Sequence, residues 1–229
     1  MKVVLSGSTG YIGGEVLSQC LNHPSITSVV LLTRRNSEAL AENPKVKVII
    51  LNDFTSYDES TANELKTADA AIWCLGTYNG DKRVDIEFPL TFIDCIKARP
   101  LGSSQFRYVQ LGGAFTEPPS EEGQKERSLW YFANGRRIRG AAEARVLETS
   151  EGSIQSAFKV YLVKPGAVLP KNATILQCVF GSSLSVGITE LAATMVDLAV
   201  HGNDQQVLRN NDIYHYHPMG LDRRTQQHH

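Results

Sequence analysis

Three glycines near the start of the chain are spaced for binding phosphate groups. Gly7, Gly10 and Gly13 stand at G-x-x-G-x-x-G spacing, after the apolar residues 3–5 and before apolar residues at helical spacing. In a strand–turn–helix of this kind, the first glycine permits the tight turn, the second lets backbone approach a pyrophosphate, and the third lets the helix pack on the sheet. The free N–H groups and the positive end of the helix dipole then hold the phosphates. The residues expected to contact a dinucleotide here are Gly7, Ser8, Thr9, Gly10, Tyr11, Ile12 and Gly13.

A pair of arginines follows the second apolar run. Arg34 and Arg35 come directly after residues 28–33, about 20 residues beyond the glycine turn. In dinucleotide-binding folds this position meets the adenosine ribose, where an acidic residue binds the 2′-hydroxyl of NAD. Guanidinium groups instead suit the 2′-phosphate of NADP, because they bind phosphate through bidentate, charge-assisted hydrogen bonds. We therefore predict NADP(H) as the cofactor; the alternative for these arginines is a solvated basic loop.

Two further strand ends carry residues suited to the same ligand. Asp53 and Phe54 follow the predicted strand 46–51. Asp53 is predicted to hydrogen-bond the adenine amino group with Phe54 beside the ring, and the alternative is that Asp53 ends the strand and begins a turn. Gly76 and Thr77 follow the predicted strand 70–75. A small residue at that exit lets backbone lie along the second ribose of the cofactor.

Apolar strands alternate with helical segments along the whole chain, and this pattern predicts the fold. Alternation of this kind implies a parallel, doubly wound sheet with right-handed crossovers, and ligand lying across the carboxyl ends of its strands. The fold class is therefore α/β: one doubly wound, parallel-sheet Rossmann domain over residues 1–229, with a small C-terminal part covering the substrate. Residues 210–229 are polar and poorly patterned, and residues 214–217 are expected to form a short strand or a solvated tail. The six predicted strands are 3–5, 28–33, 46–51, 70–75, 106–111 and 157–163, and the later helices are 83–98, 138–147 and one from 189.

Composition and charge exclude several classes of partner. The net charge of −1 provides no general field to attract nucleic acid or an anionic membrane. No apolar run approaches the roughly 20 residues needed to span a bilayer, and the start of the chain has no charged-then-apolar signal region. The partner predicted is a small-molecule substrate in the cytoplasm, with no nucleic acid, membrane or metal, and a homodimer is left open. Reduced core thiols are expected of Cys20, Cys74, Cys95 and Cys178, which form no C-x-x-C pair.

Three segments, taken with the glycine turn and the arginine pair, resemble the atypical and extended short-chain dehydrogenase/reductases. The segments are residues 74–77 (CLGT), 139–146 (RGAAEARV) and 164–166 (KPG). The likeness covers nearly the full length and is strongest to a small subgroup around a tumour-suppressor oxidoreductase. It implies an NADP-binding Rossmann fold. It also adds Cys74, Leu75, Gly112, Arg139, Lys164, Pro165, Gly166 and Val168 to the expected cofactor contacts.

The residues that transfer protons in that family are replaced in this chain. The family's fifth strand usually ends in a serine that hydrogen-bonds the substrate carbonyl, and Gly112 and Gly113 stand there. Its next helix carries Tyr-x-x-x-Lys, and the matching positions hold Gly135 and Arg139; the motif occurs nowhere in the chain. Carbonyl reduction needs an acid to neutralise the developing alkoxide, whereas a guanidinium group stays protonated. The resemblance therefore implies retained cofactor binding with altered chemistry.

Three functions stay open on these residues. The first is an enzyme repurposed for acid–base chemistry such as isomerisation, cyclisation, epoxide opening or dehydration, with Tyr131, Glu126 and Arg139 as catalytic candidates. The second is an NADPH-dependent ketone or enone reductase in which Tyr131 is the substitute acid. The third is a non-catalytic NADP-binding regulatory protein. A crevice roofed by residues 115–132 would hold the substrate, and the plainer alternative is that Tyr131 packs with its aromatic neighbours and Glu126 is a solvated loop charge.

Overall fold

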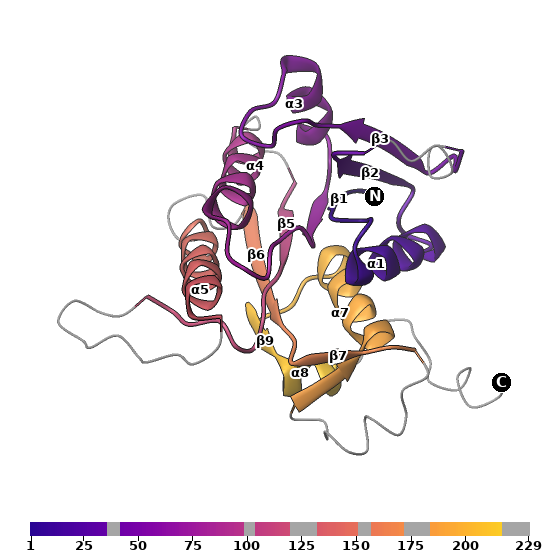
Figure 1. Ribbon diagram of the computed structural model, residues 1–229. Coiled ribbons are helices and arrows are strands. Elements are labelled where there is room, and N and C mark those ends of the chain that lie inside the picture. The colour runs from indigo at the N-terminus through magenta and orange to yellow at the C-terminus, as the bar shows by residue number, and fades with distance from the viewer. Residues whose placement is uncertain (36–41, 99–103, 120–131, 151–156, 172–183, 217–229) are drawn as a thin grey trace, which may run out of the picture.

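The computed structural model describes residues 1–35, 42–98, 104–119, 132–150, 157–171 and 184–216. Its centre is a seven-stranded sheet with the order β3-β2-β1-β4-β5-β6-β9, in which every pair of neighbours is parallel (Figure 1). The order reverses between β1 and β4, so the chain winds outward in both directions from that point. Two short strands, β7 and β8, form a separate parallel pair. The strands are β1 Lys2–Ser6, β2 Ser28–Thr33, β3 Val46–Ile50, β4 Ala70–Trp73, β5 Phe106–Leu111, β6 Phe158–Lys164, β7 Ala167–Leu169, β8 Ser185–Gly187 and β9 Val207–Arg209.

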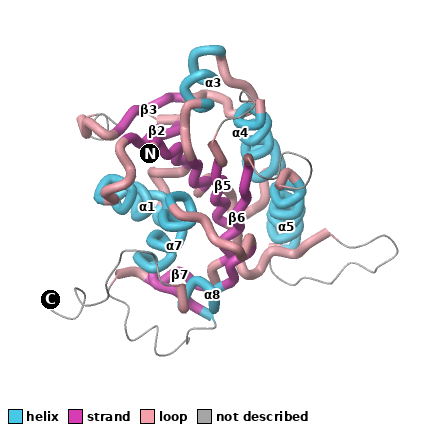
Figure 2. Tube along the Cα trace, turned by 180° about the vertical axis from the view of Figure 1, so that it is seen from behind, coloured by secondary structure: helices cyan, strands magenta, loops and turns pink. Residues whose placement is uncertain are grey.

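Helices cover both faces of the main sheet, as Figures 1 and 2 show from opposite sides. Helices α1 and α7 pack on one face, and α3, α4 and α5 pack on the other. A π-helical turn, η1, leads directly into α4, and α8 follows β9. This arrangement confirms the predicted α/β doubly wound fold. The helices are α1 Tyr11–Asn22, α3 Glu59–Lys66, η1 Arg83–Glu87, α4 Phe88–Lys97, α5 Ala133–Glu148, α7 Ile188–Val200 and α8 Asn210–Tyr214.

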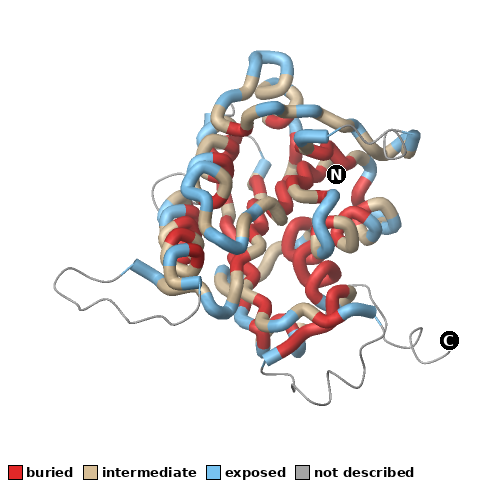
Figure 3. Tube along the Cα trace, viewed as in Figure 1, coloured by how far each residue is buried: buried red, intermediate tan, exposed pale blue. Residues whose placement is uncertain are grey.

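The strands of the sheet are buried on both faces, which explains why they read as continuous apolar runs. Val3 and Leu5 belong to the hydrophobic cluster beneath α1 and α7, whereas Val4, between them, belongs to the cluster beneath α3, α4 and α5. Successive side chains of a strand point to opposite faces, so each core needs its own apolar residues. Figure 3 shows the buried residues concentrated in the central strands and on the inner sides of the helices. The sheet is therefore a rigid platform whose strand ends carry the site.

Two parts of the chain fold differently from the prediction. The main sheet has a seventh strand, because Val207–Arg209 pairs with β6 at the edge. Asn210–Tyr214 forms helix α8, so the short strand expected at residues 214–217 is absent from the described part, residues 214–216, in which Tyr214 and His215 are exposed. The Tyr216 hydroxyl donates to the buried carboxylate of Asp197 over 2.8 Å. Elements this short are too brief to show a hydrophobic period, so the sequence pattern missed them.

The described thiols are free, and they lie in or beside the core. Cys20, Cys74 and Cys95 form no disulfide, while Cys178 lies outside the described residues. Burial raises the pKa of the Cys20 thiol to about 12, which suppresses the reactive thiolate. Among the described residues, His, Cys, Asp and Glu side chains do not gather in a group that would hold a metal ion. The same residues contain no helix with the length and apolar character to cross a bilayer.

Candidate functional site

The glycine turn after β1 is built so that backbone, rather than side chains, faces a ligand. Gly7 has a φ of +76°, and a Cβ there would lie 2.7 Å from the carbonyl carbon of Cys74. A Cβ at Gly13 would overlap the carbonyl oxygen of Gly7, so the start of α1 can pack on the turn only as glycine. In the described part of the chain, no side chain caps the start of α1 at Gly10. The turn thus leaves room and free N–H groups for a pyrophosphate, as the spacing predicted, and it fits a dinucleotide.

A cavity of about 650 Å³ opens at the carboxyl ends of the central strands. The loops after β1, β4, β5 and β6 line it, together with one face of α5 between residues 135 and 143. This is the edge at which ligands bind in open parallel sheets. Several residues predicted to contact the cofactor line this cavity: Gly10, Tyr11, Ile12, Gly13, Cys74, Leu75, Gly76, Thr77, Gly112, Arg139, Pro165, Gly166 and Val168.

The remaining predicted residues lie apart from the cavity. Arg34 and Arg35 are exposed at the end of β2, on the next strand along from the glycine turn. Gly7, Ser8 and Thr9 form the turn between β1 and α1. The other predicted contacts that do not line the cavity are Asp53, Phe54 and Lys164. The catalytic candidates Glu126 and Tyr131 lie outside the described residues.

The residues after β3 act as a turn and a core contact. The Asp53 carboxylate accepts hydrogen bonds from the N–H of Thr55 at 3.0 Å and its hydroxyl at 2.8 Å, and it forms an ion pair with Arg83 at 2.6 Å. The hydrogen bond from the Thr55 N–H is the main cause that holds the pKa of Asp53 below its ordinary value. The Phe54 ring is buried between Trp73 and Phe88. The prediction that Phe54 lies beside an adenine ring is therefore wrong, because its side chain is part of the core.

Asp85 fixes the loop after β4. This buried carboxylate, on η1, accepts hydrogen bonds from the backbone N–H of Thr77 at 2.8 Å, from the Thr77 hydroxyl, and from the N–H of Asp81 at 2.9 Å. The loop at residues 76–81 is thereby tied to the start of α4. Sequence reasoning missed Asp85, since an acidic residue in a predicted helix gave no signal that it would be buried.

The backbone of that same loop fills the space beside Gly135, the position that the resemblance matches to the family's tyrosine. A Cβ at Gly135 would overlap the carbonyl oxygen of Tyr78, and it would lie 3.0 Å from the carbonyl carbon of Asn79. Gly80, with a φ of +78°, belongs to the same loop, and a Cβ there would lie 2.6 Å from the Cα of Gly135. The start of α5 and the loop after β4 therefore touch through backbone atoms. No side chain can stand at position 135 unless this loop moves.

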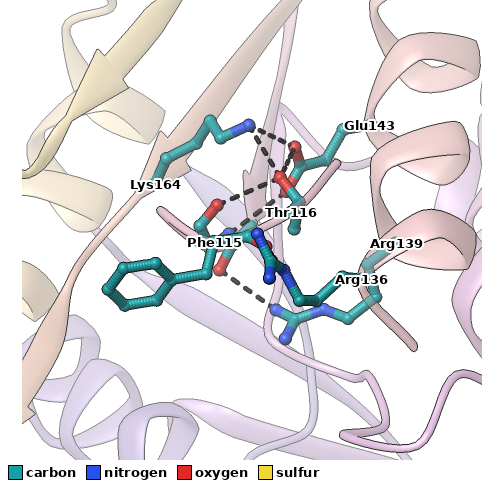
Figure 4. A network of polar contacts seen from close by, with 8 residues as sticks. Phe115, Thr116, Arg136, Arg139, Glu143 and Lys164 are labelled. Atoms are coloured by element: carbon teal, nitrogen blue, oxygen red, sulfur yellow. Dashed lines mark hydrogen bonds and ion pairs between the residues drawn. The ribbon is translucent and has the colours of Figure 1, made fainter. Parts of the chain in front are cut away.

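The space beside Gly112, the position that the resemblance matches to the family's serine, is filled as well. A Cβ at Gly112 would lie 2.5 Å from Oε1 of Glu143, a buried residue of α5. The Glu143 carboxylate accepts hydrogen bonds from the N–H of Gly113 at 3.1 Å, the hydroxyl of Thr116 at 2.7 Å and the ammonium of Lys164 at 2.5 Å (Figure 4). Lys164 also donates to the Thr116 hydroxyl at 2.8 Å. Lys164 joins β6 to α5 through these contacts, and its predicted contact with the cofactor stays a prediction.

Two arginines of α5 reach toward the loop after β5, as Figure 4 shows. Arg139 Nη2 donates to the carbonyl oxygen of Gly112 over 3.2 Å. Arg136 donates through Nε to the carbonyl oxygen of Phe115, and its Nη2 lies 3.8 Å from the Glu117 carboxylate. Both arginines line the cavity, so this wall carries two guanidinium groups beside the Glu143 carboxylate. Cys74 also lines the cavity, but burial raises the pKa of its thiol well above the ordinary value, and it is no nucleophile.

Glu143, Tyr78 and Arg136 are further contributors to the site that sequence reasoning missed. Glu143 stands one helical turn after Arg139, inside the segment that resembles the family, so the same face of α5 presents both. That spacing is a signal for Glu143. Tyr78 carries no comparable signal, because its contribution is a backbone contact with Gly135.

Comparison with known proteins gives distant sequence relatives, and no family model matches the chain. Leucinostatins biosynthesis cluster protein T of Purpureocillium lilacinum is 33% identical over 76 residues, which are 33% of this chain and 28% of that protein. The mitochondrial protein FMP52 of Candida albicans is 22% identical over 124 residues, 52% of this chain and 54% of that protein. Its namesake in Aspergillus fumigatus is 25% identical over 120 residues, 49% of this chain and 51% of that protein. The matched part of the chain spans about half or less of the length of these relatives.

Solved structures are similar over nearly the whole chain. The reductase domain of PhqB from Penicillium fellutanum superposes with a TM-score of 0.67 at 15% identity, over 91% of this chain and 66% of that one. Yeast methylglyoxal/isovaleraldehyde reductase Gre2, complexed with NADPH, superposes with a TM-score of 0.65 at 14% identity, over 91% of this chain and 78% of that one. A short-chain dehydrogenase/reductase family oxidoreductase from Burkholderia thailandensis superposes with a TM-score of 0.65 at 14% identity, over 92% of this chain and 91% of that one. The chain thus has the Rossmann fold of the short-chain dehydrogenase/reductases.

Proposed function

We propose that this protein binds NADP(H) and catalyses a non-redox, acid–base reaction of isomerase, cyclase or epoxide-opening type on a small organic molecule. One observation carries the proposal. The places of the family's serine and tyrosine are filled by the Glu143 carboxylate and the Tyr78 backbone, whereas the glycine turn keeps its space for a pyrophosphate. Packing alone requires glycine at positions 7 and 13, so the support for a ligand comes from the uncapped start of α1 at Gly10, where N–H groups without side-chain partners among the described residues suit a pyrophosphate.

Several features support NADP(H) as the ligand of the turn. The N–H groups at the start of α1 face the cavity, and Arg34 and Arg35 are exposed where the adenosine ribose would lie. Gre2, a structure of the same fold, is complexed with NADPH. When bound, a nicotinamide cofactor supplies hydride-transfer chemistry in enzymes of this fold, and it would also form one wall of the cavity.

The chain's own residues would bind and polarise the substrate. Arg139 lines the cavity beside Gly112 and supplies a fixed positive charge, which stabilises negative charge developing on a substrate oxygen. Its guanidinium group does not give up a proton, so the acid must come from elsewhere. Tyr131 and Glu126 stay the proposed acids, and a cytoplasmic location and a homodimer stay predictions.

Dinucleotide titration and turnover assays test the proposal. Fluorescence titration of the purified full chain is expected to show tight binding of NADPH and NADP⁺, and weaker binding of NADH. With a panel of ketones, enones and epoxides, we expect products that have either the same mass as the substrate or the mass of the substrate plus one water. NADPH should not be consumed. Steady NADPH oxidation with a defined carbonyl substrate would overturn the non-redox part. Absence of dinucleotide binding at millimolar concentration would overturn the whole proposal.

A non-catalytic NADP-binding regulatory protein is the second candidate. The same filling of both proton-transfer positions favours it, because a binding protein needs no acid in the cavity. Partner capture that depends on added NADPH, together with the absence of turnover, would support this reading over the enzyme. The third possibility, a reductase, rests on Tyr131 alone. It requires that Tyr131→Phe abolish NADPH-dependent turnover while leaving the dissociation constant of NADPH unchanged.

A further inference from the structure

Four aromatic side chains from separate parts of the chain surround the cavity. Tyr11 at the start of α1, Tyr78 after β4, Phe115 after β5 and Phe132 before α5 all line it. Their exposed fractions are 57%, 88%, 62% and 64%, respectively. Among the described residues, these are four of the seven large hydrophobic side chains that are exposed. Single exposed apolar residues are ordinary on a protein surface, but a gathering at one opening marks a ligand-binding site.

Phe132 is held at this opening in a strained backbone conformation. Its φ is +47°, and it is the only non-glycine residue with a positive φ in the part of the chain that the structure describes. A bulky aromatic residue is disfavoured there, and such strain persists where the surroundings fix it, often at a binding site. The Phe132 carbonyl accepts the N–H of Arg136 at 2.9 Å and so begins helix α5. The strain therefore sets both the position of the ring and the start of the helix that carries Arg139.

Arg139 is the cation of the cavity whose hydrogen-bonding capacity is least used. Its guanidinium group has five N–H donors, and one of them bonds the Gly112 carbonyl. Within the described residues, no carboxylate lies at ion-pairing distance from Arg139, whereas Lys164 neutralises Glu143 one turn further along α5. Arg136 is engaged by Phe115 and Glu117. A guanidinium group with free donors in a cavity is suited to an oxyanion, which it holds in a bidentate way.

We propose that this cavity binds a planar, aromatic or conjugated organic anion, with its ring among Tyr11, Tyr78, Phe115 and Phe132 and its carboxylate or enolate oxygen on Arg139. The inference rests on the proposed function and names the substrate class of that site. Rings stack or pack edge-to-face with planar ligands, and they also exclude water from the anion, which strengthens its pairing with Arg139. A ligand with a saturated chain would lose the packing with the rings, and a neutral ligand would lose the charge pairing with Arg139.

Binding of three matched probes to the full chain tests this substrate class. Calorimetry with cinnamate, cinnamamide and hexanoate separates the contribution of the ring from that of the charge, first without cofactor and then with saturating NADPH. Cinnamate is expected to bind about ten-fold or more tightly than cinnamamide, because a charge-assisted bond to a guanidinium group contributes about 1.5–3 kcal/mol. It is also expected to bind several-fold more tightly than hexanoate, which keeps the charge and lacks the ring. Equal affinity for cinnamate and cinnamamide, or no binding of cinnamate at millimolar concentration, would overturn the inference. This comparison needs no altered protein.

Variants then assign the effect to residues. Arg139→Met is expected to bring the affinity for cinnamate down to that for cinnamamide, while Arg145→Met, an exposed cation on the same helix, leaves it unchanged. Phe132→Ala and Tyr78→Ala should each lower the affinity for cinnamate several-fold. Tyr214→Ala should leave this affinity unchanged, because Tyr214 is an exposed aromatic residue away from the cavity. If Arg139→Met weakens NADPH and leaves cinnamate unchanged, Arg139 serves the cofactor and the inference fails. If cinnamate follows the expected pattern while NADPH does not bind, the proposed function fails and this inference stands.

Discussion

The Glu143 carboxylate and the Lys164 ammonium lie 2.5 Å apart and join helix α5 to strand β6 at the wall of the cavity. Both side chains are largely withdrawn from water, at 7% and 15% exposure. Glu143 reaches this place because residue 112 is glycine and leaves room for its carboxylate. The glycine at position 112, which the resemblance matches to the family's serine, thus makes room for an ion pair that braces the site.

Breaking this ion pair should destabilise the fold. Lys164→Met leaves a buried carboxylate without its cation, and we expect a loss of about 3–5 kcal/mol in the free energy of unfolding, measured by urea denaturation. Lys47→Met is the matched control, because Lys47 pairs with Glu64 at a similar 2.6 Å but is 56% exposed. There we expect a change within about 1 kcal/mol. Equal effects of the two variants would show that the Glu143–Lys164 pair is not buried in solution.

Gly135 should resist every side chain, including the tyrosine of the family. Gly135→Ala places a Cβ against the Tyr78 carbonyl, and overpacking of this kind costs about 1–3 kcal/mol. Gly14→Ala is the control, since its Cβ would lie 3.5 Å from the Ser8 carbonyl, an ordinary contact in a helix. That variant should match or exceed the wild-type free energy of unfolding. A Gly135→Tyr variant that gained NADPH-dependent ketone reduction would contradict this view of the site.

Much of the framework followed from sequence, because it depends on strong local patterns. The apolar runs at residues 28–33 and 106–111 became β2 and β5 with those bounds, since buried parallel strands must be apolar on both faces. The turn at Gly7 followed from spacing and a positive φ that glycine tolerates. The close backbone contacts within the site could not be predicted from the sequence, because a contact such as that of Tyr78 with Gly135 joins segments that are far apart in the chain. Phe54 was misplaced for the same reason: its burial depends on Trp73 and Phe88.

The stability of the fold should depend on pH through Glu64. This carboxylate of α3 is held by Lys2 from β1 and by Lys47 from β3, each at 2.6 Å. The hydrogen bond from Lys2, followed by that from Lys47, lowers the pKa of Glu64 below its ordinary value. A lowered pKa in the folded state contributes stability above the unfolded value, about pH 4.3, and that contribution is lost as the pH falls further.

Glu64→Gln should therefore be less stable than wild type at pH 7, with a difference that shrinks to zero in acid. Urea denaturation between pH 7 and about pH 3 measures this convergence. Glu148→Gln, an exposed carboxylate of α5, is the control and should follow the wild-type profile. A Glu64→Gln deficit that stays constant across the whole range would mean that the charge of Glu64 plays no part in it.

The arginines after β2 should decide between the two dinucleotides. Arg34 and Arg35 are exposed at the end of a strand adjacent to β1, where charge can reach a 2′-phosphate and has no other role in the core. The double variant Arg34→Ala/Arg35→Ala is expected to weaken NADPH about ten-fold or more and to leave NADH unchanged, because a charge-assisted bond to phosphate contributes about 1.5–3 kcal/mol. Fluorescence titration with both nucleotides measures the ratio, and Arg145→Ala controls for the general loss of a positive charge. If both nucleotides weaken equally, the arginines act through the fold and the preference for NADP must come from another residue.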